Sequence, residues 1–225
     1  SGRLGTSQKM VRILHDRAKT SPKRLVFAEA DQMDVLKAAQ IVQEEGIAIP
    51  ILLGNRATIE DLRTAISFDD DVEIIDPKEE TYNDQRNIYA ELFWKDQRRK
   101  GYTQYDTLRL MRERNYFASM MIKNGDADAM ISGYSRNYRS VVKPILETIS
   151  KAKGVSRVAA TNLMLTKTGP LFLSDTTINV DPSAKELAKI TQMTANMAKL
   201  FGLEPVTALL SFSNFGSSRF PHAKK

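Results

Sequence analysis

Cysteine is absent from this 225-residue sequence, and histidine occurs only twice. The lack of cysteine excludes disulfide bonds, thiol nucleophiles and thiolate metal sites. His15 and His222 lie near opposite ends of the chain and indicate neither a metal cluster nor a Ser–His pair. No apolar run approaches the roughly 20 residues of a membrane span, and no signal peptide is visible. We therefore expect a cytoplasmic protein with no metal site and no membrane partner.

Positively charged residues are only mildly in excess of negatively charged ones. The chain carries 33 Lys and Arg against 27 Asp and Glu, a formal net charge of +6. This excess favours an anionic small ligand such as a nucleotide or phosphate ester. The one dense basic cluster, Lys95 to Lys100, is typical of a solvated helix end. Nucleic acid is not an expected partner, because no stacking aromatics interleave a basic groove.

Motifs for nucleotide cofactors are also missing. The sequence contains neither a Walker loop nor the G-x-G-x-x-G fingerprint of a nicotinamide cofactor. A dehydrogenase contained within this chain is therefore disfavoured, and no cofactor is expected in it.

Strand-like apolar runs alternate with helical periodicity along most of the chain. Strands are predicted at 24–29, 47–53, 72–75 and near 130, and helices at 10–18, 35–42, 58–66, 79–100, 103–123 and from 137 onward. Asp31 is predicted to cap one helix and Asp181 another, with Pro182 at its first position. Pro50 counts against a central place for its strand. The alternation predicts an α/β fold, a mostly parallel sheet with helices on both faces.

The region 157–175 departs from this alternation. Two neighbouring strands, 157–165 and 171–175, are joined by the turn Thr168-Gly169-Pro170, as in a β-hairpin. A second α/β subdomain is therefore predicted, with boundaries 1–148 and 149–225. The helices at 79–100 and 103–123 carry more large apolar residues than a small subdomain hides, so a homo-oligomer contact is predicted there.

The stretch from Val206 to Ser218 begins as an apolar run and ends in small polar residues. Such a run predicts a buried parallel strand, and ligands bind beyond the carboxyl ends of these strands. Gly216 allows backbone N–H groups to approach an anion closely. An equally good alternative is a Ser/Gly-rich surface turn.

Two further predicted strands end in small polar residues, Ser132-Gly133 and Ser174 to Thr177. Arg136 and Arg139 follow the first and suit bidentate binding of phosphate, although a solvated helix terminus explains either one alone. Together with the polar residues that end the Val206 to Ser218 stretch, these two polar strand ends are expected to converge on one cleft. No catalytic residue is assigned. The ligand-binding candidates are Ser132, Gly133, Tyr134, Arg136, Arg139, Asp175, Thr176, Ser211, Ser213, Asn214, Gly216, Ser217 and Ser218.

Three motifs in this order resemble the phosphate acetyltransferase/phosphate butyryltransferase family. They are Gly125-Asp-Ala-Asp-Ala-Met-Ile-Ser-Gly133, Asp175-Thr-Thr-Ile-Asn-Val-Asp-Pro-Ser-Ala-Lys-Glu-Leu-Ala188 and Leu209-Leu-Ser-Phe-Ser-Asn-Phe-Gly-Ser-Ser218. The resemblance implies two α/β subdomains, a cleft for coenzyme A and acetyl phosphate, and a dimer or larger assembly. The last motif is most similar to the version fused to bacterial NADP-dependent malic enzymes.

Two departures from the family pattern bear on activity. Stand-alone transferases carry Thr-Ala-Asp where this chain has Arg136-Asn-Tyr-Arg-Ser140. They also continue to an Asn-Asp-Leu-Ser-Arg stretch that serves the chemistry, whereas this sequence ends at Lys225, so the second subdomain is expected to be incomplete. The resemblance therefore implies a non-catalytic regulatory and oligomerisation domain with acetyl-CoA as effector. NADP and a divalent metal are expected only in an absent part that oxidises malate to pyruvate.

Two alternatives stay open at this stage. One is a true phosphate acetyltransferase that acts on an acyl-CoA or acyl phosphate, and the other is a purely structural oligomerisation module.

Overall fold

The computed structural model describes residues 5–68 and 71–211, and its contacts divide the chain into two compact units. The larger unit is His15–Ser150, and the smaller combines the described residues up to Leu14 with those from Lys151 onward. The division at 148/149 remains a prediction for the domain boundary. Each unit is described by itself.

The larger unit contains four strands and six α-helices among its described residues, together with the end of α1 (Thr6–Thr20) from His15 onward, while the first part of α1 belongs to the smaller unit. The strands are β1 (Lys23–Phe27), β2 (Ala48–Leu53), β3 (Glu73–Ile75) and β4 (Ala129–Ile131). The helices are α2 (Met33–Glu44), α3 (Arg56–Ile66), α4 (Asn83–Gln97), α5 (Gln104–Leu110), α6 (Arg114–Asn124) and α7 (Tyr138–Thr148), with 3-10 turns η1 (Glu80–Tyr82) and η2 (Arg98–Lys100) beside α4.

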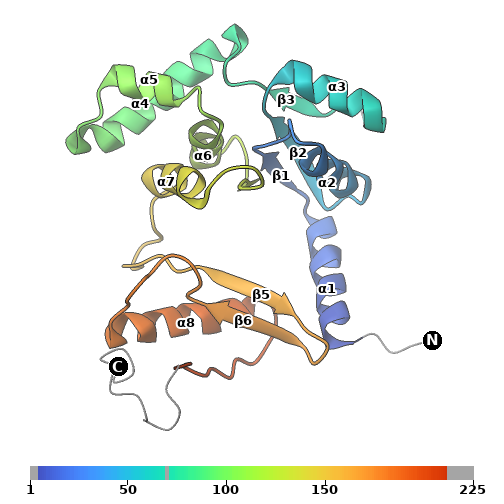
Figure 1. Ribbon diagram of the computed structural model, residues 1–225, viewed down its shortest axis with the longest axis vertical. Coiled ribbons are helices and arrows are strands. Elements are labelled where there is room, and N and C mark those ends of the chain that lie inside the picture. The colour runs from blue at the N-terminus through green and yellow to red at the C-terminus, as the bar shows by residue number, and fades with distance from the viewer. Residues whose placement is uncertain (1–4, 69–70, 212–225) are drawn as a thin grey trace. The chain divides into compact units, whose positions relative to one another are not determined.

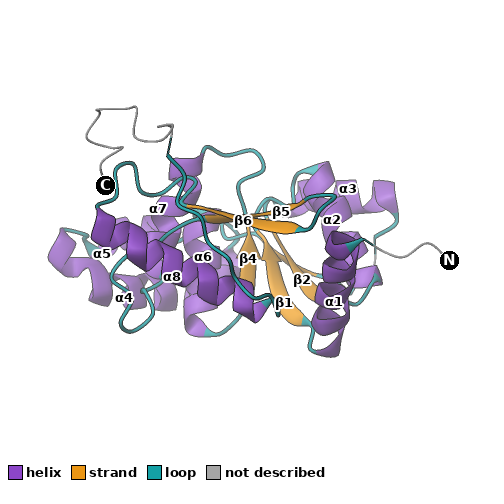
Figure 2. Cartoon of the chain, turned by 90° about the horizontal axis from the view of Figure 1, so that it is seen from below, coloured by secondary structure: helices purple, strands orange, loops and turns teal. Residues whose placement is uncertain are grey.

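The four strands form one parallel sheet in the order β3-β2-β1-β4. Figure 2 labels three of them, β2, β1 and β4. In register, Leu25 lies opposite both Pro50 and Ala129. Helices α2 and α3 lie on one side of the sheet and α4, α5, α6 and α7 on the other (Figure 1). This confirms the predicted α/β class with a parallel sheet covered on both faces.

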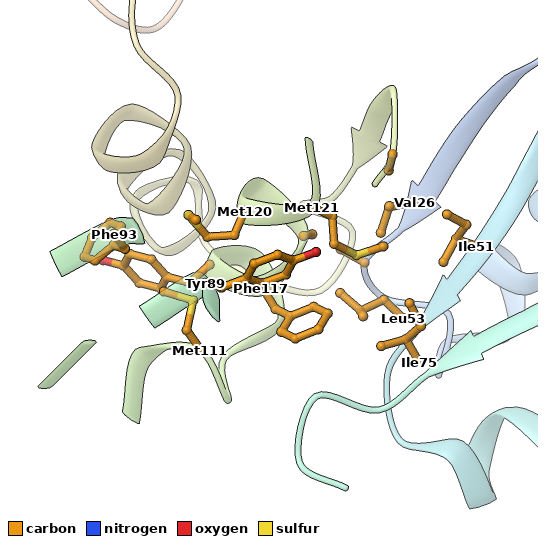
Figure 3. Close-up of a cluster of buried hydrophobic side chains, with 14 of the residues drawn as sticks. Val26, Ile51, Leu53, Ile75, Tyr89, Phe93, Met111, Phe117, Met120 and Met121 are labelled. Carbon is orange, nitrogen blue, oxygen red and sulfur yellow. The ribbon is translucent and has the colours of Figure 1, made fainter. Parts of the chain in front are cut away.

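Alternation along the strands divides the core between these two faces. Val26 belongs to a cluster on one face that also contains α4 and α6 side chains such as Phe93 and Phe117, as the close-up in Figure 3 shows. Its neighbour Phe27 packs on the opposite face with residues such as Leu36 of α2. Strands covered on both sides consist of nearly continuous apolar residues, which explains why the sequence signal for them was strong.

Pro50 occupies an inner strand, contrary to the objection raised from the sequence. Strand β2 lies between β1 and β3, but its pairing with β3 starts only at Ile51. Pro50 therefore lies where β2 has β1 as its only neighbour, a position at which a missing N–H donor is tolerated.

The helix predicted at 103–123 is two helices, α5 and α6. The break lies at Glu113, whose side-chain carboxylate accepts hydrogen bonds from the N–H groups of Asn115 (2.9 Å) and Tyr116 (3.1 Å). This carboxylate satisfies two of the free donors at the start of α6 and so fixes a new helix start. Periodicity alone does not reveal such a cap.

Two predicted caps were wrong. The N-cap of α2 is Gln32, while Asp31 binds Arg114. Helix α8 (Ala184–Leu200) has Ser183 as its N-cap, and Glu186 accepts hydrogen bonds from the N–H (2.8 Å) and Oγ (2.9 Å) of that serine. A capping box satisfies the N-terminal donors of α8 two residues beyond Asp181.

The smaller unit contains a β-hairpin and α8 (Ala184–Leu200). Strands β5 (Thr161–Leu165) and β6 (Pro170–Ser174) pair antiparallel, as the sequence predicted. Phe172 of β6 stacks edge-to-face on Phe201, with ring centroids 5.5 Å apart, and so joins the hairpin to the end of α8.

The strand predicted from Val206 to Ser211 does not form. These residues have no regular structure, and Val206 is 99% exposed. In the described part of this unit β5 and β6 pair only with each other. An apolar run becomes a buried strand only where a partner strand is available, and the described residues provide none beside this run.

Several apolar side chains of α4 and α5 remain exposed, including Ile88, Leu92, Tyr105 and Leu108. The homo-oligomer contact predicted for these helices stays a prediction. Among the described residues, no helix has both the length and the apolar character needed to cross a membrane.

Candidate functional site

The carboxyl ends of the four parallel strands form one edge of the larger unit. The chain builds β1, β2 and β3 outward in one direction and then returns to the other side of β1 with β4. Strand order therefore reverses between β1 and β4, and such switch points are where α/β sheets bind ligands. The segments that follow the strands here contain Glu29, Asn55, Asp76 and Ser132.

Glu29, directly after β1, is 1% exposed and occupies the space beside the end of β4. Its carboxylate accepts hydrogen bonds from the N–H groups of Gly133 (2.6 Å), Tyr134 (2.7 Å) and Ser135 (2.9 Å). The Ser135 Oγ donates a fourth bond at 2.5 Å. Gly133 has φ +108°, a conformation that favours glycine and turns the successive N–H groups toward one point. The turn is thus an anion-binding nest that an internal carboxylate already fills.

The nest keeps Glu29 ionised. Burial by itself raises the pKa of Glu29, but the hydrogen bonds from Ser135, Gly133 and Tyr134 outweigh it and lower the pKa to about 2. The side chain therefore remains a carboxylate at every physiological pH and ties the end of β1 to the turn after β4.

The side chains of Ser132 and Tyr134 also have partners within the protein. The Ser132 Oγ donates to Asn115 Oδ1 at 2.7 Å, and the Tyr134 hydroxyl donates to Asp34. The hydrogen bond to Asp34 raises the pKa of Tyr134. Both contacts hold the β4–α7 turn in place.

Arg136 and Arg139 follow this turn and are exposed. Arg139 lies in the first turn of α7, which Asn137 caps by accepting a hydrogen bond from the Ser140 N–H at 3.0 Å. Within residues 5–68 and 71–211, neither arginine side chain forms a hydrogen bond or an ion pair. Both guanidinium groups are therefore available to an anion.

A cleft of about 280 Å³ opens at the carboxyl ends of β2 and β3. Five cationic side chains line it, and we refer to it as the basic cleft. They are Lys78, Arg109, Arg112, Arg114 and Arg136.

Two carboxylates, Asp76 and Glu113, also line the basic cleft. Asp76 Oδ1 accepts a hydrogen bond from the Lys78 N–H at 2.9 Å, and Glu113 caps α6. Burial raises the pKa of Glu113 above its ordinary value, while the cap hydrogen bonds and the charge of Arg136 act in the opposite direction. The cations outnumber these carboxylates, so the cleft is suited to anions.

Arg114 forms one wall of the basic cleft and is fixed by Asp31. The guanidinium donates to both carboxylate oxygens, at 2.8 and 2.9 Å, and both side chains are largely shielded from solvent, at 20% and 13% exposure. This bidentate pair joins the end of β1 to the start of α6.

The smaller unit holds the remaining described candidates. Asp175 accepts hydrogen bonds from the N–H groups of Ala160 (3.2 Å) and Asn179 (3.0 Å), so both of its oxygens stabilise the local backbone. Thr176 and Ser211 are exposed. Ser213, Asn214, Gly216, Ser217 and Ser218 lie outside the described residues.

Comparison with known proteins assigns the family. The model of the phosphate acetyl/butaryl transferase family matches residues 9–225. The chain belongs to this family.

Similar members of the phosphate acetyl/butaryl transferase family fall into two groups. The NADP-dependent malic enzyme of Haemophilus influenzae is 37% identical over 214 residues, which cover 92% of this chain and 28% of that protein. The phosphate acetyltransferase of Thermoanaerobacterium thermosaccharolyticum is 33% identical, covering 93% of this chain and 65% of the relative. A phosphotransacetylase from Streptococcus pyogenes has a similar structure, with TM-score 0.82, 32% identity, and coverage of 95% of this chain and 64% of that one.

The chain is therefore a transferase-family domain of the kind found both in malic enzymes and in phosphate acetyltransferases, and it spans 28% of the malic enzyme's length. The structure gathers Ser132, Gly133, Tyr134, Arg136 and Arg139 at one turn of the larger unit. Their predicted convergence with the candidates of the smaller unit remains a prediction.

Sequence reasoning missed Glu29 and most of the basic cleft. Lys78 could have been found, because it follows the Asp-Pro pair directly after β3. Arg109 and Arg112 could not, because in the sequence they lie at the end of α5, many residues from any strand. Within the described ranges, no group of His, Cys, Asp and Glu is arranged to hold a metal ion.

Proposed function

We propose that this domain binds acetyl-CoA as a regulatory, non-catalytic part of an NADP-dependent malic enzyme. The observation that carries the proposal is the pair of available cations, Arg136 and Arg139, at the turn after β4. Relatives named NADP-dependent malic enzyme, of which a domain like this one forms about a quarter, support the parent protein.

The phosphate groups of the ligand would contact arginine side chains. The N–H groups of Gly133 and Tyr134 already bond to Glu29, so the proposal assigns no ligand contact to them. A guanidinium matches the geometry of phosphate oxygens and binds them through two parallel hydrogen bonds. We further propose that the parent protein oxidises malate to pyruvate with NADP and a divalent metal held elsewhere, and that it is a cytoplasmic homo-oligomer.

Replacing Arg139 with alanine tests this site. A charge-assisted hydrogen bond contributes about 1.5–3 kcal/mol, so Arg139→Ala is expected to weaken acetyl-CoA binding by roughly ten- to a hundredfold. The fold should be unaffected, because Arg139 is exposed and has no partner within the described residues. Calorimetric titration of the full-length protein measures the change, with Arg99→Ala as a control at an exposed cation of η2. If Arg139→Ala and Ser213→Ala both bind acetyl-CoA as tightly as the parent, the site lies elsewhere.

A second candidate function is acyl transfer between acetyl phosphate and CoA, favoured by the relatives named phosphate acetyltransferase. We expect this chain not to catalyse it, because Arg136-Asn-Tyr-Arg-Ser140 stands where stand-alone transferases carry Thr-Ala-Asp. Loss of a group made for the transition state costs about 10²–10³ in rate. A turnover assay that detects acetyl-CoA formation at a rate typical of enzymes, on the order of 1–10³ per second, would establish the transferase instead.

A further inference from the structure

The basic cleft carries positive charge that the protein itself does not neutralise. Of its five cations, only Arg114 has an ion-pair partner, Asp31, within the described part of the chain. The side chains of Lys78, Arg109, Arg112 and Arg136 form neither hydrogen bonds nor ion pairs there.

A further cation, Arg86 of α4, is buried near Arg112 but does not line the cleft. Burial, followed by the charge of Arg112, lowers the pKa of Arg86, and the charge of Asp76 acts in the opposite direction. Like charges held close together cost free energy unless a counter-anion is present. The arrangement is therefore more stable with an anion bound.

The surroundings of the cleft add to its preference for anions. Asn55 caps α3 by accepting the Thr58 N–H at 3.0 Å, so this helix begins at the cleft. Helix α6 begins there too, but the Glu113 carboxylate already binds two of its first N–H groups. Helix N-termini carry partial positive charge. The cleft also lies beyond the carboxyl ends of β2 and β3, where α/β sheets open to ligands.

Size limits the ligand. The cleft measures about 280 Å³, slightly below the roughly 300–1,000 Å³ typical of pockets for drug-sized molecules. Of the two arginines proposed to contact acetyl-CoA, Arg136 lines the cleft and Arg139 does not. The guanidinium fork matches two oxygens of a phosphate or of a carboxylate. Four cations without ion-pair partners in the described part of the chain favour a ligand with several negative charges, which linked phosphate groups supply.

We propose that the basic cleft is a binding site for a second, compact ligand that carries two or more phosphate groups, separate from acetyl-CoA. Arg109, Arg112 and Lys78 bind the phosphates, and Arg114, held by Asp31, forms a fixed wall. Arg136 lines the cleft and also belongs to the proposed acetyl-CoA contact, but Lys78, Arg109 and Arg112 belong to the cleft alone and Arg139 does not line it. Variants of these unshared residues therefore test the two sites separately.

Inorganic pyrophosphate is a suitable probe because it presents two linked phosphates and nothing else. Calorimetric titration of the full chain at low ionic strength is expected to show one pyrophosphate bound, more tightly than orthophosphate, which reaches fewer cations. The double variant Arg109→Gln/Arg112→Gln should bind it at least about tenfold more weakly. Arg99→Gln, which removes an exposed cation outside the cleft, should bind within about twofold of the parent because surface charge alone contributes little.

Three results would overturn the proposal. They are no pyrophosphate binding by the parent, an equal loss in Arg99→Gln and in the cleft variant, and competition between pyrophosphate and saturating acetyl-CoA. The last would assign the cleft to the diphosphate of CoA itself. Arg139→Ala, by contrast, is expected to retain pyrophosphate binding even if its acetyl-CoA affinity falls.

Discussion

Replacing Glu29 with glutamine is expected to lower the free energy of unfolding by about 3 kcal/mol at neutral pH. The carboxylate accepts four hydrogen bonds from the turn 133–135 and is buried. Its pKa is lowered from 4.5 to about 2 by these bonds, and each unit of pKa corresponds to about 1.4 kcal/mol of differential stabilisation. In glutamine, an NH₂ group replaces one of the two carboxylate oxygens. This group cannot accept hydrogen bonds, so the N–H groups that pointed at that oxygen lose their acceptor.

The effect has a defined pH dependence. Because the folded-state pKa lies below the unfolded value, the stabilisation is complete above pH 4.5 and is lost as the pH falls toward 2. The difference between parent and Glu29→Gln should therefore shrink by more than half at about pH 3. Urea unfolding at neutral pH and at about pH 3 measures this difference in the free energy of unfolding.

Glu91→Gln is a matched control at an exposed residue paired with Lys95, for which a change in the free energy of unfolding within about 0.5 kcal/mol is expected. A difference that persists undiminished at low pH would show that Glu29 acts through packing and not through charge.

The same contact bears on binding at Arg136 and Arg139. The turn that Glu29 holds leads directly into these two residues and the start of α7. A variant that loosens the turn lets both guanidinium groups sample more orientations, and binding must then restore their order at an entropic cost. Glu29 is in this sense a positioning residue for the proposed acetyl-CoA contact.

Local sequence signals predicted the parallel sheet well because its strands are buried on both faces. The apolar runs around Val26 and Ile51 match the near-continuous apolar pattern of strands in a covered parallel sheet, and the helices between them indicated the parallel direction. The same kind of run at 206–211 gave a wrong prediction. Its outcome depends on a partner strand from elsewhere in the chain, which the run itself does not encode.

The candidate site was predictable only where it follows a strand directly. Ser132, Gly133 and Arg136 were found because strand ends mark ligand sites in α/β sheets. Glu29 follows a strand too, but a single carboxylate there does not indicate that a distant turn will surround it. The basic cleft combines residues from the β3 end, the α5–α6 break and the β4 turn, so only the assembled sheet brings them together.

The Asp31–Arg114 ion pair gives a test that distinguishes the sequence interpretation from the structure. The sequence indicated a helix cap at Asp31, and asparagine serves an N-cap as well as aspartate does. Under that interpretation Asp31→Asn leaves the free energy of unfolding almost unchanged. In the structure Asp31 binds both Nη atoms of Arg114 in a largely shielded position. Removing the charge leaves the guanidinium partly buried and uncompensated, so Asp31→Asn is expected to lower the free energy of unfolding by about 3 kcal/mol.

Urea unfolding of four proteins, the parent, Asp31→Asn, Arg114→Met and the double variant, measures this coupling directly. The double variant should be less destabilised than the sum of the two single changes, because it no longer contains an unpaired buried charge. Asp84→Asn, at an exposed aspartate in the first turn of α4, is a matched control for which about 0.5 kcal/mol or less is expected. Additive effects of the two single variants, or a neutral Asp31→Asn, would show that the pair contributes nothing.

Since Arg114 is also a wall of the basic cleft, the Asp31→Asn variant releases one more uncompensated cation into it and should bind pyrophosphate more tightly than the parent.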